Sequence, residues 1–187
     1  RGDLKNWLIM VLFAAIVALT TTQDAQAQNH TRSGAIIDSL LAENTGPVTR
    51  SLNSQVKRGI NIQGELPPEL DLPNIALTIN FELGSARLTT DGKIALRSLA
   101  VALRDPRLQG QTFQVAGHTD GRGDAAANQA LSDARAQQVV RHLTDWYGVP
   151  FGTLVPVGYA TRRPMDAANL LNPLNRRVEI INVTPLS

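Results

Sequence analysis

The sequence predicts an α+β fold, a two-layer sandwich in which two helices cover one face of a mixed, four-stranded sheet. Residues 75–81 carry large apolar side chains at every second position, which is typical of a strand with one buried face. Two longer segments repeat apolar residues at helical spacing, and three further short apolar runs complete the pattern. The resulting order of strand, helix, strand, helix, strand, strand leaves both helices to one face of the sheet.

The first helix is expected to begin near Thr90 and to end before Pro106, which cannot continue a helix. Its apolar side chains fall at positions i, i+3, i+4 and i+7, namely Leu96, Leu99, Ala100 and Leu103. Residues 113–117 then predict the second strand.

The second helix is expected over residues 125–147, with Gly148 ending it in a left-handed conformation. Its apolar face consists of Ala136, Val139, Val140, Leu143 and Tyr147. Residues 153–158 predict a third strand at a sheet edge, because Pro156 cannot donate a ladder hydrogen bond. Residues 177–183 predict the fourth strand.

The length of 187 residues suffices for one ordinary domain with accessory segments and excludes a large multidomain enzyme. Lys and Arg total 18 against 16 Asp and Glu, and this net charge of +2 gives no support for nucleic-acid binding. The sequence has no Cys, which excludes disulfides, thiolate metal sites and a catalytic thiol.

Residues 1–27 are expected to be a secretory signal peptide. Basic residues precede the uncharged apolar run 7–19, and Ala25 and Ala27 supply the small side chains that a signal peptidase requires. The alternative is an uncleaved membrane anchor over 7–22. Spanning the membrane takes about 20 apolar residues, however, and a polar stretch follows this run too soon.

Residues 28–73 are predicted to be a flexible periplasmic spacer, because they are rich in Asn, Gln, Ser, Thr and Pro. One short apolar patch, 35–41, has the length of two helical turns. Three prolines within 66–73 favour extended chain. The folded domain is therefore expected over residues 74–187.

A loop over 117–124 leads from the second strand into the second helix and carries Asp120. If Asp120 lies where the strand ends, it sits at the carboxyl edge of the sheet, where ligands commonly bind. At about 100° per residue, one narrow helix face then presents Asn128, Leu131, Ser132 and Arg135. We therefore expect a small pocket flanked by one carboxylate and one guanidinium.

This pair of charges suits a zwitterionic ligand. A guanidinium holds a carboxylate through two parallel hydrogen bonds, and an aspartate complements an ammonium group. The alternative is that Asp120 and Arg135 pair with each other in a salt bridge that pins the loop.

Several motifs occur together along the predicted domain: Phe81-x-x-Gly84-Ser85-Ala86-x-Leu88, Gly117-His118-Thr119-Asp120, the helix pattern over 128–143, Gly158-Tyr159 and Asn175-Arg176-Arg177-Val178-Glu179. Together, from about Ile75 to Val183, they resemble the OmpA-like peptidoglycan-associating domain. Members of that family bind the meso-diaminopimelate residue of the peptidoglycan stem peptide without any chemical reaction. The free amino-acid head of this residue is a zwitterion.

The resemblance implies which residues form the site. Asp120 and Arg135 would be the principal contacts with the ligand. Thr119, Asn128 and Leu131 would shape the pocket, and the loop from Phe81 to Ala86, which includes Gly84, would form its opposite wall. Two positions depart from the family pattern. Ala127 replaces a common aromatic residue and would leave one wall more open, whereas Ala160 replaces a glycine and is expected to affect loop conformation.

The resemblance further implies a non-catalytic periplasmic module that anchors to peptidoglycan, at the cell wall or the outer membrane, without a cofactor. No metal site is predicted, because His118 and Asp120 are only two candidate ligands. His118 is interpreted as a loop-organising residue, and a hydrolase that used this pair would lack a third catalytic group.

Two questions stay open at this level. If the N-terminal segment is retained, the chain would be an inner-membrane-anchored, stator-like envelope component whose main role is protein–protein contact. N-terminal sequencing of the exported protein separates this alternative from a cleaved module. Arg176 and Arg177 enter the last strand, where alternation predicts one at the ligand edge and the other in solvent.

Overall fold

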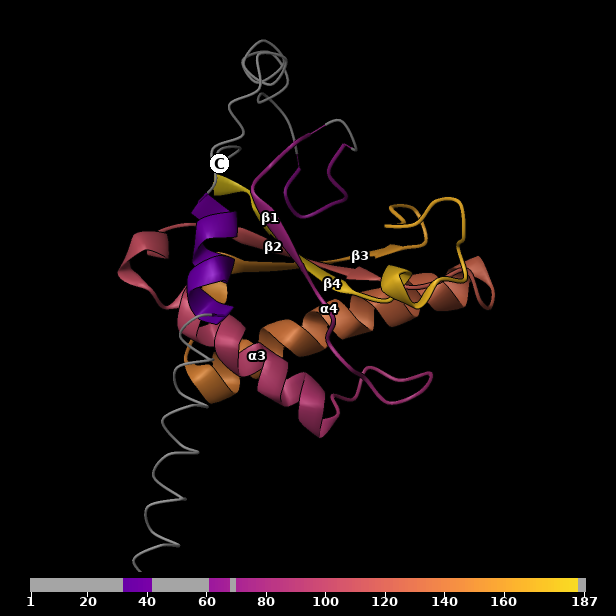
Figure 1. Cartoon of the computed structure of the whole chain (residues 1–187), viewed down its shortest axis with the longest axis horizontal. Helices are drawn as coiled ribbons and strands as arrows, with labels where there is room; N and C mark the ends of the chain where they lie inside the picture. The colour runs from indigo at the N-terminus through magenta and orange to yellow at the C-terminus, as the bar shows by residue number, and fades with distance from the viewer. Residues whose placement is uncertain (1–31, 42–60, 68–69, 185–187) are drawn as a thin grey trace, which may run out of the picture.

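The computed structural model describes residues 32–41, 61–67 and 70–184. Its four-stranded sheet has the order β1-β4-β2-β3. The strands are β1 (Asn74–Leu77), β2 (Phe113–His118), β3 (Leu154–Ala160) and β4 (Val178–Asn182). β2 and β3 are parallel, whereas β4 is antiparallel to both β1 and β2 (Figure 1). The mixed sheet is therefore confirmed, and β3 is the edge strand that Pro156 predicted.

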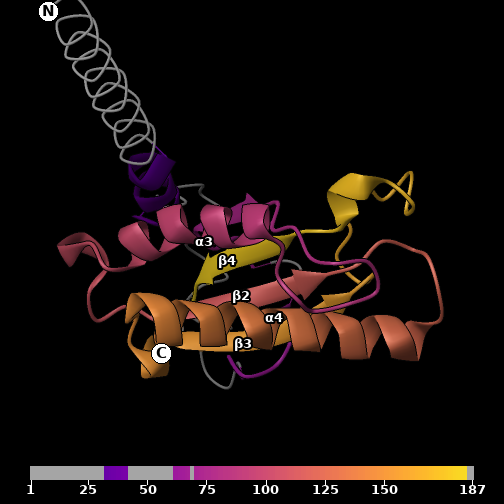
Figure 2. The ribbon, with the colours of Figure 1, turned by 90° about the horizontal axis from the view of Figure 1, so that it is seen from below.

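Helices α3 (Thr90–Leu103) and α4 (Ala125–Tyr147) lie over the same face of the sheet (Figure 2). Each begins at a side-chain cap: Thr89 accepts from the Gly92 amide, and Asp124 accepts from the Ala127 amide. Gly148 ends α4 with φ +65°, as predicted. Three short 3-10 helices join the larger elements: η1 (Pro106–Leu108), η2 (Phe151–Thr153) and η3 (Pro173–Asn175).

The main core lies between these helices and the sheet. The apolar stripes predicted for both helices are buried there, except for partly buried Tyr147, and pack against strand residues such as Val115 and Ile180. β1 is shorter than the expected 75–81, because its ladder with β4 ends at Leu77. Ile79 and Phe81 nevertheless continue the alternation into the core, and Phe81 forms an isolated bridge with Leu88.

Two glycines let α4 approach the sheet closely. A side chain at Gly117 would collide with the Ser132 carbonyl, and one at Gly158 would collide with Asp133 and the Ser132 hydroxyl. The amide of Gly158 instead donates to Oδ1 of Asp133 at 2.8 Å. This contact fixes the middle of α4 over the carboxyl ends of β2 and β3.

The prediction that residues 28–73 form a flexible spacer is wrong for the residues of this range that the structure describes. Residues 32–41 form a helix, and Ile36, Ile37 and Leu40 are buried in the main core (Figure 1, indigo). Nδ2 of Asn182 donates to the Leu40 carbonyl at 3.0 Å. Burial of each such side chain contributes about 1.5–3 kcal/mol, which outweighs the polar composition of the surrounding sequence.

Residues 61–67 and 70–73, here called the strap, cover the opposite face of the sheet. Its Leu66 and Leu72 are buried against the strand side chains of that face: Ala116, Val155, Val157, Tyr159 and Ile181. The prediction missed this packing because the strap's apolar residues are separated by prolines and polar residues. The sheet is thus covered on both faces, by helices on one and by the strap on the other.

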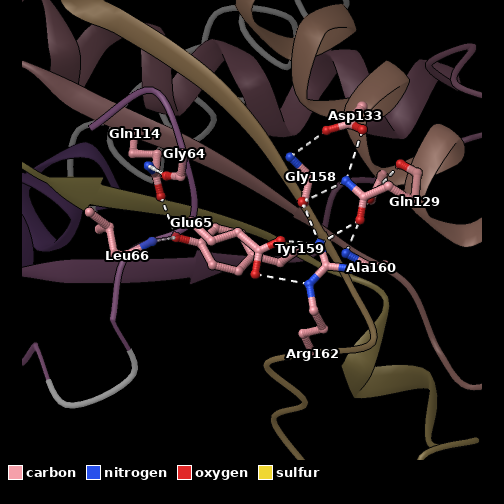
Figure 3. Close-up of polar contacts among 11 residues, drawn as sticks. Gly64, Glu65, Leu66, Gln114, Gln129, Asp133, Gly158, Tyr159, Ala160 and Arg162 are labelled. Atoms are coloured by element: carbon pink, nitrogen blue, oxygen red, sulfur yellow. Dashed lines mark hydrogen bonds and ion pairs between the residues drawn. The ribbon is translucent and has the colours of Figure 1, made fainter. Parts of the chain in front are cut away.

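A polar network joins the strap to the sheet. The Tyr159 hydroxyl accepts from the Leu66 amide and donates to Oε1 of Gln114, each at 2.7 Å (Figure 3). Nε2 of Gln114 donates to the carbonyls of Ile62 and Gly64 at 3.0 and 2.9 Å. We call these five residues the strap network.

The described helices include none long and apolar enough to cross a membrane. The predicted signal peptide, residues 1–27, lies outside the described residues, as do residues 28–31 and 42–60 of the predicted spacer.

Candidate ligand-binding site

A cavity of about 520 Å³ opens where β2 ends. Its walls come from the segment after β1, the end of β2, the first half of α4 and the residues around η3. We call it the ligand cavity. All seven predicted site residues line it: Phe81, Gly84, Thr119, Asp120, Asn128, Leu131 and Arg135.

A bulge in the sheet turns the chain into the ligand cavity. The β2–β3 register shifts after Gly117, so that His118 pairs with Ala160. Ala160 has φ +48°, a left-handed conformation that favours glycine, and its carbonyl accepts from the Thr119 amide at 2.9 Å. The departure at Ala160 therefore affects backbone conformation, as expected, and Ala160 itself does not line the cavity.

Asp120 is buried, with 6% of its surface exposed. Its Oδ2 lies 2.5 Å from NH1 of Arg176 and 3.8 Å from Nε of Arg122. Its Oδ1 accepts from the Arg122 amide at 3.2 Å. A carboxylate offers about four lone pairs, so these contacts hold Asp120 in place and leave it capacity for a further donor.

Arg135 reaches the ligand cavity from α4. Its Nε donates to the Ser85 carbonyl at 3.0 Å, and its guanidinium carbon lies 4.9 Å from the centre of the Phe81 ring. Its NH1 and NH2 groups have no hydrogen-bond partner within the described chain. Burial lowers the pKa of Arg135 and nearby Arg176 lowers it further, while Asp120 opposes both.

Asp120 and Arg135 do not form an ion pair within 4.0 Å in the part of the chain that the structure describes. The alternative that they pin the loop together is therefore wrong. Arg176 and Arg122 contact the carboxylate instead, and the guanidinium of Arg135 is held by a backbone carbonyl.

The remaining predicted residues have different surroundings. Oγ1 of Thr119 is buried and has no hydrogen-bond partner among residues 32–41, 61–67 and 70–184. Nδ2 of Asn128 donates to the Arg122 carbonyl at 2.8 Å, which fixes the loop beside Asp120. Leu131 is half-buried and contributes apolar wall. Ala127 is exposed and does not line the cavity.

The prediction that one of Arg176 and Arg177 lies at the ligand edge and the other in solvent is wrong, because both line the cavity. Arg176 lines the cavity and is the nearest charged partner of Asp120. Arg177 is buried rather than in solvent, and its NH2 group donates to the Arg163 carbonyl at 3.0 Å. Neither residue obeys strand alternation, because β4 begins only at Val178 and Arg176 follows a 3-10 turn.

His118 is buried at the boundary between the cavity and the sheet. Its ring stacks on Tyr159 with 5.3 Å between centroids, and its Nε2 lies 3.1 Å from Oε2 of Glu179. Burial lowers the pKa of His118, and the nearby Arg177 adds to this effect, while Glu179 opposes it. These contacts fit the predicted loop-organising role.

Positive charge dominates the ligand cavity. Its lining includes four arginines, Arg122, Arg135, Arg176 and Arg177, but only two carboxylates, those of Asp120 and Glu82. A ligand that carries carboxylates is therefore favoured, provided that any ammonium group it bears meets Asp120. The described residues contain no group of three or more His, Asp or Glu side chains that could hold a metal ion.

Comparison with known proteins places this site in a family. The family described as OmpA matches residues 80–176, which include all seven predicted site residues. The peptidoglycan-associated lipoprotein of Pseudomonas aeruginosa is 36% identical over 121 residues, covering 64% of this chain and 69% of the relative. Outer membrane porin F of the same species is 31% identical over 115 residues, covering 60% of this chain but only 32% of that protein.

Solved structures show the same fold. The periplasmic domain of Helicobacter pylori MotB has a TM-score of 0.52 at 24% identity, covering 64% of this chain and 88% of that chain. The OmpA-like domain of FopA1 from Francisella tularensis has a TM-score of 0.50 at 23% identity, covering 57% and 70%. With its motifs, its sheet order and the family match over 80–176, this chain belongs to the OmpA family.

Proposed function

We propose that this chain is a non-catalytic anchoring module that binds peptidoglycan in the periplasm by its meso-diaminopimelate side chain. The name of the peptidoglycan-associated lipoprotein, 36% identical, supports peptidoglycan as the ligand. The zwitterionic head of diaminopimelate is the part of the polymer that matches the charges of the ligand cavity.

One observation carries the proposal. Within a single cavity, the NH1 and NH2 groups of Arg135 and the buried hydroxyl of Thr119 lack partners among the described residues, while Asp120 keeps acceptor capacity. Buried polar groups are almost always hydrogen-bonded, so the unpaired Thr119 hydroxyl, together with the free NH1 and NH2 groups of Arg135, supports a polar ligand for this cavity. Such a ligand would supply an acceptor for the guanidinium and a donor for the carboxylate.

The ligand head would be held at both ends. Its carboxylate would accept two parallel hydrogen bonds from Arg135, and its ammonium group would donate to Asp120. Thr119 would add one hydrogen bond, and Phe81 would pack on the aliphatic side chain. Arg176 would hold Asp120 in place and add to the positive field.

Binding without reaction is favoured by the state of His118. A hydrolase would need this imidazole as a base, but it is stacked on Tyr159 and its Nε2 faces Glu179. The remaining cavity groups donate or accept hydrogen bonds and need not react. We further propose that residues 1–27 are a cleaved signal peptide and that the module is associated with the cell wall.

Retention on purified sacculi tests the proposal. Sacculi whose stem peptides carry meso-diaminopimelate should retain the full chain, and Asp120→Ala and Arg135→Ala should each abolish retention. Arg141→Ala and Asp145→Ala change the same charges on exposed positions of α4 outside the cavity and should leave it unchanged. Retention of both cavity variants at the wild-type level would refute the site.

A further inference from the structure

A second hollow, of about 420 Å³, lies on the other side of the loop that walls the ligand cavity. It is lined by residues of that loop, of α3 and of the C-terminal half of α4: Glu82, Arg87, Leu88, Thr89, Thr90, Lys93, Gln138, His142 and Trp146. We call it the Trp146 groove. None of the seven predicted site residues belongs to it.

The groove continues the ligand cavity along one face of α4. Arg135, Gln138, His142 and Trp146 fall within about 80° of one another at about 100° per residue. At about 1.5 Å per residue, this face extends about 16 Å beyond Arg135. Glu82 lines both hollows, and the loop that carries it also supplies the carbonyl that holds Arg135.

Trp146 supplies a large, flat apolar surface to this groove. Its residue surface is 77% exposed, although it lies beside buried His142, whose ring centre is 5.9 Å away and tilted by 31°. His142 is held in turn by an edge contact with Tyr147 at 5.6 Å. An aromatic face backed on one side and open on the other suits stacking on the apolar face of a sugar ring.

The rest of the groove is polar and offers donors and acceptors for hydroxyl and acetamido groups. Lys93 forms no ion pair within the described ranges, and Arg87 pairs only with Glu82, at 3.4 Å. Gln138 makes one long contact, 3.4 Å from Arg141. An aromatic face surrounded by polar side chains, of which Lys93 and Gln138 are the least engaged, distinguishes this groove from an apolar docking surface for a protein.

We propose that the Trp146 groove binds the amino-sugar glycan strand of the same peptidoglycan molecule whose stem peptide occupies the ligand cavity. This inference rests on the proposed function. Two residues separate diaminopimelate from the sugar that bears the stem peptide, a span of about 7 Å when extended. When the stem peptide runs along α4 away from Arg135, its first sugar begins about 7 Å along this face of about 16 Å, and the glycan strand continues over the rest of it to Trp146.

Calorimetric titration of the full chain with two fragments tests the inference. One fragment is the free stem tripeptide ending in meso-diaminopimelate, and the other is the same tripeptide attached to its disaccharide. The wild type should bind the disaccharide form about five- to tenfold more tightly, the size of effect that one stacked aromatic side chain supplies. Trp146→Ala should lose this advantage and retain the affinity for the free tripeptide.

Phe151→Ala is the matched control, because Phe151 is an aromatic residue with 76% exposure that lies outside both hollows. It should bind both fragments as the wild type does. Equal affinity of the wild type for both fragments would overturn the glycan groove and leave the proposed function standing. Binding of neither fragment by the wild type would overturn both proposals.

Discussion

The ligand cavity and the strap network meet where His118, which lines the cavity, stacks on Tyr159 of the network, and their buried polar groups are paired to different extents. In the strap network, Gln114 is fully buried and all its side-chain polar atoms are paired, two donated bonds to the strap and one accepted from Tyr159. In the ligand cavity, Thr119 and Arg135 keep unpaired groups within the described chain. Similar burial thus accompanies complete pairing in one region and incomplete pairing in the other.

This difference separates a structural region from a binding region. A saturated network has no capacity for a ligand, and its loss leaves several buried groups without partners, which destabilises the fold. An unsaturated cavity sacrifices some stability, and a ligand can restore the missing bonds. Substitutions in the strap network should therefore reduce stability, whereas substitutions in the ligand cavity should reduce binding.

The largest stability effect is expected from Gln114→Leu. This change removes three hydrogen bonds and leaves two strap carbonyls and the Tyr159 hydroxyl without their partner. The free energy of unfolding should fall by about 3 kcal/mol, measured by urea denaturation. Gln109→Leu, at an exposed position, should leave it nearly unchanged. Sacculi should still retain the folded variant. A loss of retention would contradict the distinction between a structural region and a binding region.

The pH dependence of stability sharpens the comparison, because His118 lines the cavity and also stacks on Tyr159. Burial lowers the pKa of folded His118 below its ordinary value of 6.5, despite nearby Glu179. The unfolded chain therefore binds a proton more readily, and stability present above pH 6.5 is lost as the pH falls below it.

Urea denaturation at pH 7.5 and 5.5 measures this loss, which for one group is at most about 1.4 kcal/mol per pH unit. His118→Gln should reduce the slope, while His142, whose pKa is also lowered by its burial, keeps its own contribution. An unchanged slope in His118→Gln would show that the histidine is not held neutral by the fold.

Arg176→Gln is expected to act on binding. Arg176 lies 2.5 Å from the carboxylate of Asp120, so its loss frees that carboxylate to move and removes one positive charge from the cavity. Affinity for sacculi should fall about fivefold, and its salt dependence should weaken. Arg122→Gln, whose side chain is more exposed and 3.8 Å away, should have a smaller effect. A gain in affinity would mean that Arg176 competes with the ligand.

The smallest effect is expected at the bulge that separates the two regions. Ala160→Gly relieves a left-handed conformation at φ +48° and should raise the free energy of unfolding by about 0.5 kcal/mol. Ala130→Gly, at an exposed helical position, should lower it by about 1 kcal/mol. Equal losses in both variants, compared by urea denaturation, would contradict the strain at Ala160.

The elements that sequence predicted well are those whose signals are local. The second helix agreed at both ends because Asp124 and Gly148 cap it within the adjacent turns. The packed segments that the sequence did not predict depend on partners far away in the chain. Leu66 needs the far face of the sheet, and Leu40 needs the main core together with Asn182. Composition alone cannot show that a polar segment will dock.

The site follows the same rule. Asp120 and Arg135 were predicted because the strand end and the helix period place them together. Arg176 was underestimated because its position depends on the 3-10 turn η3, where strand alternation does not hold. Arg176 is identified as a site residue by its short distance in space from Asp120. That distance is known only once β4 is paired with β2.

Selectivity between two stem tripeptides tests the central claim most directly. One ends in meso-diaminopimelate, and the other ends in lysine, which has the same ammonium group but lacks the side-chain carboxylate. Calorimetric titration should show the diaminopimelate form binding at least about tenfold more tightly, the value of one bidentate charged hydrogen bond. Arg135→Ala should erase that preference. Equal affinity of the wild type for both tripeptides would contradict the account.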